Sequence, residues 1–234
     1  MTPPENHLIR RLPARERQAL LALAEPVELR LSAVLVEADA PSPDLYLPLS
    51  GFVSLIIPVD QHPGLEVGMV GWEGLLGLHR LLGHSRSPLR VVVQGAGEAL
   101  RLPWASFQPL LQASPGLQDT LRRYLGNHLD QLARAVACQR FHTIAPRLAR
   151  WLLMSQDRAR SSEIQVTHAF LAYMLGVRRV GITLAAQRLQ LAGLIDYRRG
   201  VLGVLDRRGL EDAACNCYRA DRLRYAEVLG EPGG

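Results

Sequence analysis

Residues Leu175 to Glu211 read LGVRRVGITLAAQRLQLAGLIDYRRGVLGVLDRRGLE, and this stretch decides the fold of the second half of the chain. A helical pattern covers Val166 to Ile195 and is broken at Gly176, where a glycine permits a tight turn. Two short apolar runs then flank Arg199-Gly200, which predicts a small hairpin. Helix, turn, helix and hairpin in this order predict a winged helix-turn-helix.

Basic residues are concentrated in the same half of the chain. All 27 basic residues among the 234 are arginine. Residues 1–138 contain 12 Arg and 13 acidic residues, a net charge of −1, whereas residues 139–234 contain 15 Arg and 9 acidic residues, a net charge of +6. A basic half that holds a helix-turn-helix indicates contact with double-stranded DNA. From charge alone, a solvated basic face is the alternative.

The first half has a different texture. Seven short apolar runs, separated by Gly, Pro, Asp and Ser, read VELRL, AVLVE, DLYLPL, GFVSLIIP, LEVGMV, RVVVQG and EALRLP between Val27 and Pro103. Their spacing predicts strands of an antiparallel β-sandwich or jelly roll, so the expected fold class is α+β. A short amphipathic helix is expected before them, over Pro13 to Ala24.

A long helical pattern runs from Ser114 to Gln139, and another helix is expected over Ile144 to Met154. The long helix carries one narrow apolar stripe, formed by Leu117, Leu121, Leu125, Leu129, Leu132 and Val136. A stripe this narrow predicts pairing with a single partner helix, and hence a homodimer. The alternative is that the stripe covers the sandwich of its own chain.

The order of these parts resembles the Crp/Fnr family of bacterial transcription regulators. The resemblance rests on Leu175–Glu211, on YLPLSGFVSL at Tyr46–Leu55 and on GWEGLLGL at Gly71–Leu78, and it is weak before Leu12. It implies a cyclic-nucleotide-binding-like sensor domain over 12–113, a dimerisation helix over 114–139 and a winged helix-turn-helix over 140–229. It also implies a near-palindromic DNA operator, with RNA polymerase as a further candidate partner.

The second helix of the motif and the hairpin supply the expected DNA contacts. The fork of Arg179 is suited to guanine and falls where the family's base-reading Arg lies. Val180 stands where the best-known members carry Glu, and Leu184 where many carry Arg, so the expected operator differs from theirs. Of Ile182, Leu184, Ala185, Leu189 and Leu191, some must face the core. The expected DNA-contacting residues are Thr167, His168, Arg178, Arg179, Val180, Thr183, Gln187, Arg188, Arg198 and Arg199.

Two of these groups have simpler alternatives. For His168, the alternative is a solvated residue in the first turn of a helix that makes no DNA contact. For Arg198 and Arg199, the alternative is an exposed hairpin without a DNA-binding role. The predicted roles therefore depend on where the fold places these side chains.

The sensor half departs from its family at the ligand site. The phosphate cassette would lie at Gly74 to Arg90, where Ser85-Arg86-Ser87 resembles the Arg-Ser pair that holds a cyclic phosphate. Leu75 stands where cAMP-binding members carry Glu, which leaves a ribose hydroxyl unpaired, so we expect weak cAMP binding or none. The candidate effector-binding residues are Gly74, Leu75, Arg86 and Ser87.

The effector and cofactor stay unknown at this level. Three alternatives stay open for the sensor domain: it binds another nucleotide, it binds a different effector, or it serves only as a dimer scaffold. For Arg86 the alternative is a plain surface arginine.

Other chemistries lack support in the sequence. Cys138, Cys215 and Cys217 all come late, and Cys215-Asn216-Cys217 is tighter than the usual CxxC metal knuckle, so we expect reduced thiols and no metal site. Haem binding is an alternative through one of four histidines, namely His7, His62, His79 and His84. No HxH, GxSxG, P-loop or HExxH motif occurs, so no enzyme is expected. The chain shows neither a leader nor an apolar run of about 18 residues, so a cytoplasmic location off the membrane is expected.

Overall fold

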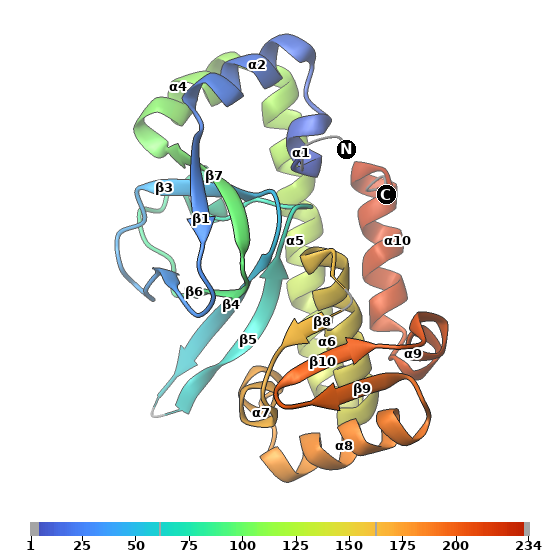
Figure 1. The fold of residues 1–234 in the computed structure, drawn as a ribbon. Helices are drawn as coiled ribbons and strands as arrows, with labels where there is room; N and C mark the ends of the chain where they lie inside the picture. The colour runs from blue at the N-terminus through green and yellow to red at the C-terminus, as the bar shows by residue number, and fades with distance from the viewer. Residues whose placement is uncertain (1–4, 61, 162, 232–234) are drawn as a thin grey trace.

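The computed structural model describes residues 5–60, 62–161 and 163–231. These form a β-sandwich, a long helix beside it and a C-terminal helical domain with a small sheet (Figure 1). The α+β fold class and the division into sandwich, long helix and winged helix-turn-helix follow the order that the sequence predicts.

Two antiparallel sheets make the sandwich. One has the strand order β1-β7-β3 and the other β2-β6-β4-β5. The strands are β1 Glu25–Leu29, β2 Val34–Val36, β3 Asp44–Pro48, β4 Phe52–Val59, β5 His62–Val70, β6 Arg90–Gly95 and β7 Gly97–Pro103. Every predicted apolar run is therefore a strand. Leu45 and Leu102 face one another across β3 and β7 and are fully buried, as the alternation of side chains in strands requires.

Four short helices close the sandwich. They are α1 His7–Arg10, α2 Ala14–Leu23, α3 Leu78–Leu81 and α4 Trp104–Ala113. Helix α2 is the predicted N-terminal helix, whereas α4 was not predicted. Glu16 of α2 accepts hydrogen bonds from the backbone N–H groups of Gly116 and Leu117, at 3.2 and 2.7 Å. A carboxylate at a helix N-terminus satisfies free N–H groups, so Glu16 fixes where the long helix begins.

The long helix is α5, Pro115–Phe141, and α6, Ile144–Ala159, follows it after two residues. Pro115 stands at the first helical position, where its missing N–H costs nothing. Helix α10, Cys217–Leu229, lies alongside α5, so the chain's C-terminal segment returns to the sensor side (Figure 1).

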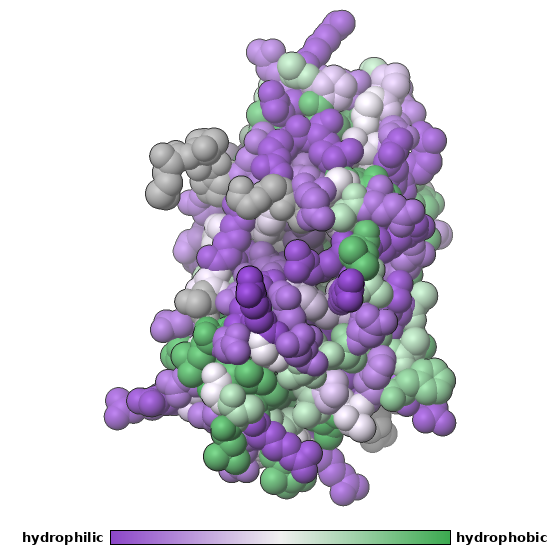
Figure 2. All heavy atoms as spheres, turned by 90° about the vertical axis from the view of Figure 1, so that its right-hand side faces the viewer, coloured by the Kyte–Doolittle hydropathy of each residue, from purple (hydrophilic) through white to green (hydrophobic). Residues whose placement is uncertain are grey.

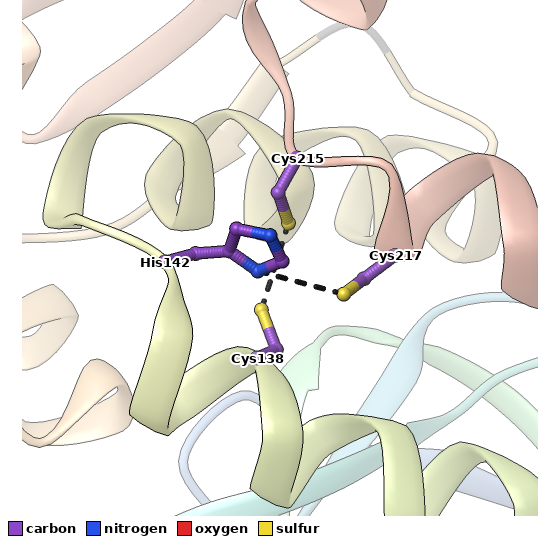
Figure 3. A group of neighbouring side chains, drawn as sticks. All are labelled: Cys138, His142, Cys215 and Cys217. Carbon is purple, nitrogen blue, oxygen red and sulfur yellow. Dashed lines mark hydrogen bonds between the residues drawn. The ribbon is translucent and has the colours of Figure 1, made fainter.

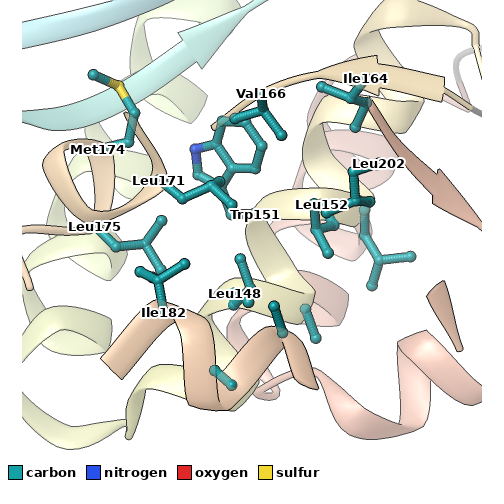
Figure 4. Packing of buried hydrophobic residues seen from close by; sticks show 14 of the residues in the cluster. Leu148, Trp151, Leu152, Ile164, Val166, Leu171, Met174, Leu175, Ile182 and Leu202 are labelled. Carbon is teal, nitrogen blue, oxygen red and sulfur yellow. The ribbon is translucent and has the colours of Figure 1, made fainter. Parts of the chain in front are cut away.

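The C-terminal domain is built around α6. Its other elements are β8 Glu163–Gln165, α7 His168–Leu175, α8 Arg179–Leu191, β9 Ile195–Arg198, β10 Val201–Val204 and α9 Arg207–Ala213. Leu148 and Leu152 of α6 are fully buried against Leu171, Ile182 and Leu202 (Figure 4). This shared core holds the two helices of the motif and the wing as one unit. Strand β8, which the sequence pattern did not predict, completes a wing sheet of order β8-β10-β9.

Among the described residues, no single helix combines the length and apolar composition of a membrane span. The helices α7 and α8 reach that composition only when taken together, and they are bent by 109° at their junction.

Candidate nucleic-acid interface

The turn between α7 and α8 has the expected local chemistry. Thr167 caps α7, because its Oγ1 accepts a hydrogen bond of 3.1 Å from the backbone N–H of Phe170. Gly176 ends the helix in the left-handed region at φ 63°, which glycine adopts without strain. The predicted helix-turn-helix is confirmed, with α8 beginning at Arg179.

Helix α8 has one buried and one exposed face. Ile182, Ala185 and Leu189 are buried, as predicted. Leu184 and Leu191 belong to the set from which core residues were expected, but they are 53% and 89% exposed. The helical period separates them from the buried face, so the other three residues of the set are the ones that face the core. The outer face of α8 is therefore partly apolar.

Three arginines and one glutamine also lie on that outer face. Arg178, Arg179, Gln187 and Arg188 are exposed. Within the described residues, none of the three arginines forms an ion pair with an acidic side chain. Figure 2 shows hydrophobic and hydrophilic side chains side by side at the lower end of the molecule, the end at which α8 lies in Figure 1. Unpaired guanidinium groups on an exposed helix are available to phosphates and base edges.

The wing adds two further arginines. β9 and β10 pair as an antiparallel hairpin whose turn residues Arg199 and Gly200 have φ of 51° and 84°. Two successive positive φ values form the tight hairpin turn that matches strand twist. Arg198 lies 3.1 Å from Asp196, but its side chain is 82% exposed, so this surface pair contributes little to stability and leaves the guanidinium accessible. The predicted hairpin is confirmed.

His168 has a more structural position than expected. Its ring stacks on Tyr197 of the wing at 4.6 Å, and its Nδ1 lies 3.1 Å from Oγ1 of Thr183 on α8. Burial, and then the charge of Arg179, lowers the pKa of His168. His168 and Thr183 are thus partners of each other inside the unit, and His168 joins the start of α7 to both α8 and the wing.

A family model and solved structures resemble this arrangement. Residues 146–213 match the model of the Crp-like helix-turn-helix domain. This segment belongs to the Crp-like helix-turn-helix domains. No curated protein sequence matches the chain.

Solved structures share this fold over most of the chain at low sequence identity. The c-di-GMP responsive global regulator CLP of Xanthomonas campestris is 19% identical with a TM-score of 0.68, over 83% of this chain and 100% of that one. FixK2 of Bradyrhizobium japonicum is 14% identical with a TM-score of 0.69, over 82% and 98%. TTHA1359 of Thermus thermophilus, described as a Crp/Fnr transcriptional regulator, is 21% identical with a TM-score of 0.64, over 81% and 98%.

The expected effector residues of the sensor half do not form an open pocket together. Leu75 is 2% exposed and belongs to the core between the sandwich and α5. Gly74 lies against Tyr124 of α5, so closely that an added Cβ would stand 2.0 Å from its hydroxyl oxygen. Arg86 is exposed and donates a hydrogen bond of 2.5 Å to the carbonyl oxygen of Asp39. Ser87, the next residue in the chain, is buried.

The apolar stripe of α5 divides into two parts. Leu117 and Leu121 are 2% and 5% exposed in the core of their own chain, so their expected place in a dimer interface is corrected. Leu129 and Val136 are 56% and 70% exposed. Leu125 and Leu132 are half-buried between these extremes. Only the second half of the stripe is free to meet a partner helix.

The histidines considered as haem ligands lie in different environments. His7 is buried and its Nδ1 lies 2.7 Å from the hydroxyl of Tyr225, while burial lowers its pKa to about 4. His79 is partly buried, His84 is exposed, and the side chain of His62 lies outside the described residues. Haem binding at these positions stays a hypothesis without a ligand pair to support it.

Sequence reasoning missed two polar groups inside the structure. Asn127 and His128 of α5 are 1% and 7% exposed, and within the described residues the amide of Asn127 and Nδ1 of His128 have no hydrogen-bond partner. His128 packs against β5, where Gly68 lies opposite its ring. The sequence pattern could not reveal this, because both residues follow the exposed Gly126 on a helix whose covered side was unknown.

A second missed group consists of cysteines and one histidine. Cys138, His142, Cys215 and Cys217 lie together at the end of α5. The local signals for it were the spacing of Cys138 and His142, four residues apart at the end of a helix, and the pair Cys215 and Cys217.

Proposed function

We propose that this chain is a homodimeric regulator that reads a near-palindromic operator with α8 and positions itself on the phosphates with the wing. The observation that carries the proposal is the set of exposed arginines at the start and end of α8, which form no ion pair within the described part of the chain, together with the exposed Arg198 and Arg199 of the wing. Arg179 is proposed to bind guanine through its fork, and Val180 to contact a thymine methyl group. Thr167, Arg178, Gln187 and Arg188 are proposed to contact the adjacent backbone or base edges.

The dimer is proposed to form through the exposed half of the α5 stripe. Two parallel α5 helices would place two copies of α8 on one face of the assembly, and an operator read in this way needs half-sites about 34 Å apart. RNA polymerase is the partner proposed for a DNA-bound form, in the cytoplasm. The sensor domain is proposed to act without the usual cAMP contacts, because Leu75 lies in the core.

Asn127 and His128 support a second proposal, that a small polar effector or an ordered water network binds between α5 and β5. Buried polar atoms without a partner cost about 1–3 kcal/mol each, so a ligand that satisfies them gains affinity. Such a ligand would shift an equilibrium between orientations of the DNA-binding domain. Among nucleotides, cyclic di-GMP is worth testing, because CLP is described as responsive to it.

The experiment is selection of bound fragments from sheared genomic DNA by purified protein, first without additive and then with cAMP, cyclic di-GMP or haem. An enriched palindrome supports the DNA-binding proposal, and dependence on one additive identifies the effector. Fragments without any shared sequence, bound with the same affinity as random DNA, would contradict sequence-specific binding.

A further inference from the structure

The end of α5 and the loop between α9 and α10 bring four metal-ligating side chains to one point (Figure 3). Cys138 lies in the last turn of α5, and His142 follows directly after that helix. Cys215 and Cys217 flank Asn216 at the start of α10. The three sulfurs and one imidazole nitrogen all lie within 4.8 Å of one another, and all three cysteines are buried.

We propose that Cys138, His142, Cys215 and Cys217 bind one Zn²⁺ ion in tetrahedral coordination. The sulfurs of Cys138 and Cys215 are 3.5 Å apart, and the sulfur of Cys217 is 3.6 Å from Nδ1 of His142. With Zn–S near 2.3 Å and Zn–N near 2.0 Å, two sulfur corners of a tetrahedron are about 3.8 Å apart and a sulfur and a nitrogen corner about 3.5 Å apart. Both separations lie within about 0.3 Å of these values, so these two pairs are already spaced for one ion.

The donor set selects the kind of ion. Three thiolates and one imidazole make up one of the usual ligand sets of structural zinc sites, and soft thiolates disfavour Mg²⁺ and Ca²⁺. An iron–sulfur cluster spreads its protein ligands over more than one iron, so ligands on different irons stand farther apart than ligands of one ion. The compact arrangement in Figure 3 therefore favours a single ion.

The backbone holds these ligands in place independently of any ion. The N–H of His142 donates to the carbonyl oxygen of Cys138 at 3.1 Å, which ends α5 with both side chains on one face. The N–H of Cys215 donates to the carbonyl oxygen of Pro146 at 3.3 Å, which ties the second loop to α6. A site formed from preorganised loops loses less conformational entropy when the ion binds.

A buried cation balances the charge of the site. Three thiolates and Zn²⁺ carry a net charge of about −1. Arg150 of α6 has a side chain that is only 13% exposed, and it lies close enough to act electrostatically on all three cysteines. Its guanidinium also forms a 2.9 Å ion pair with Asp221 of α10. Arg150 therefore connects the proposed metal site to the helix that packs against α5.

The position of the site gives it a role. It lies where α5 passes into α6, and its four ligands come from the end of α5, the α5–α6 junction and the start of α10. A bound ion would fix the direction in which α6, with the helix-turn-helix packed on it, leaves the long helix. Loss of the ion or oxidation of the thiols would loosen this joint and weaken operator binding, a consequence that rests on the proposed function.

The first test is metal content. The full chain, purified without a metal-affinity tag and dialysed against a weak chelator, is analysed by mass spectrometry for metals, and about one zinc ion per chain is expected. After removal of zinc under reducing conditions, Co²⁺ is added as a spectroscopic probe. We expect thiolate-to-cobalt charge-transfer absorption and the intense visible bands of tetrahedral Co²⁺, together with release of thiol protons.

Variants locate the site. Cys217→Ser and His142→Asn should lower zinc content at least several-fold and abolish or shift the cobalt spectrum, whereas His84→Asn, at an exposed histidine, should leave both unchanged. His142 is the less buried ligand, so its variant keeps the test valid where a cysteine variant does not fold. Circular dichroism checks the folding of each.

Several outcomes would overturn the proposal. The proposal is wrong if wild-type protein binds neither Zn²⁺ nor Co²⁺ while its three thiols react freely. It is also wrong if both ligand variants retain zinc in full. Iron and sulfide in place of zinc would overturn the choice of ion. Operator affinity is measured separately. If removal of zinc leaves operator affinity unchanged, the proposed role of the ion in orienting α6 is refuted, but zinc binding at these four residues is not. If no form of the protein binds DNA, the result contradicts the proposed function and not the metal site.

Discussion

The indole N–H of Trp151 donates a hydrogen bond of 2.9 Å to Oε1 of Glu66. Glu66 lies on β5 of the sensor sandwich, and Trp151 lies on α6 in the core of the DNA-binding domain. Glu66 also accepts a hydrogen bond from Ser54 on the neighbouring strand β4. The two domains are thus joined by a half-buried carboxyl group that accepts hydrogen bonds from both of them.

Glu66→Gln should make the protein more stable at high pH. Burial raises the pKa of Glu66 to about 7, against the opposing effects of its hydrogen bonds to Ser54 and Trp151 and of Arg158 and Arg150. The folded chain then holds this proton more tightly than the unfolded chain, so stability falls as pH rises from about 4.5 to about 7. The glutamine cannot ionise, so above about pH 7 the free energy of unfolding of the variant should exceed that of the wild type by up to roughly 3 kcal/mol.

The measurement is urea unfolding of both proteins at about pH 5 and about pH 8. Burial lowers the pKa of His128 to about 4, which makes stability rise with pH between about 4 and 6.5 in both proteins, so the difference between them isolates Glu66. Glu98→Gln, at an exposed position, should leave the pH profile unchanged. Equal profiles for wild type and Glu66→Gln would contradict the role given to this carboxyl group.

Arg179→Ala should weaken operator binding about 5- to 150-fold and relax the preference at one base pair, because a bidentate arginine–guanine contact contributes roughly 1–3 kcal/mol of discrimination. Arg198→Ala should weaken binding to all DNA alike and reduce the salt slope by about 1. Fluorescence anisotropy over a salt series measures both. Arg30→Ala, on the sensor domain, serves as control, and unchanged specificity in Arg179→Ala would remove this residue from base reading.

Leu129→Glu should convert a dimer into a monomer at micromolar concentration, because it places a charge on the exposed half of the α5 stripe. Leu223→Glu is the matched control, since Leu223 is 59% exposed on α10, close to the 56% of Leu129. Light scattering after size-exclusion chromatography gives the mass of each. A dimer that survives Leu129→Glu would move the interface to another surface.

Gly74→Ala and Gly126→Ala should change stability in opposite directions. A methyl group at Gly74 would stand 2.0 Å from the hydroxyl oxygen of buried Tyr124, and such overpacking costs about 1–3 kcal/mol. Gly126 lies inside α5 with nothing within 4 Å of an added Cβ, so alanine there should stabilise the helix by about 0.5–1 kcal/mol. Urea unfolding compares the two, and a neutral Gly74→Ala would show that Tyr124 moves away without cost.

Local patterns accounted for much of the fold. The seven apolar runs are all strands, and the break at Gly176 and the turn at Arg199-Gly200 are where the pattern placed them. Helices α4, α9 and α10 escaped prediction, because their apolar residues meet partners that are distant in the sequence. Phe107 of α4, for example, is 1% exposed in a core shared with α1, α2 and α5.

The sequence by itself therefore determined the seven strands of the sandwich, the long helix and the basic helix-turn-helix with its hairpin, because turn residues and apolar periodicity act over a few residues. Only the tertiary structure decided which side of each helix is covered. It buried Leu117 and exposed Leu129 on the same stripe, and it brought Cys138 and Cys215, 77 residues apart, to 3.5 Å. Such relationships follow from the packing of distant elements against each other, and the spacing of residues along one element does not contain them.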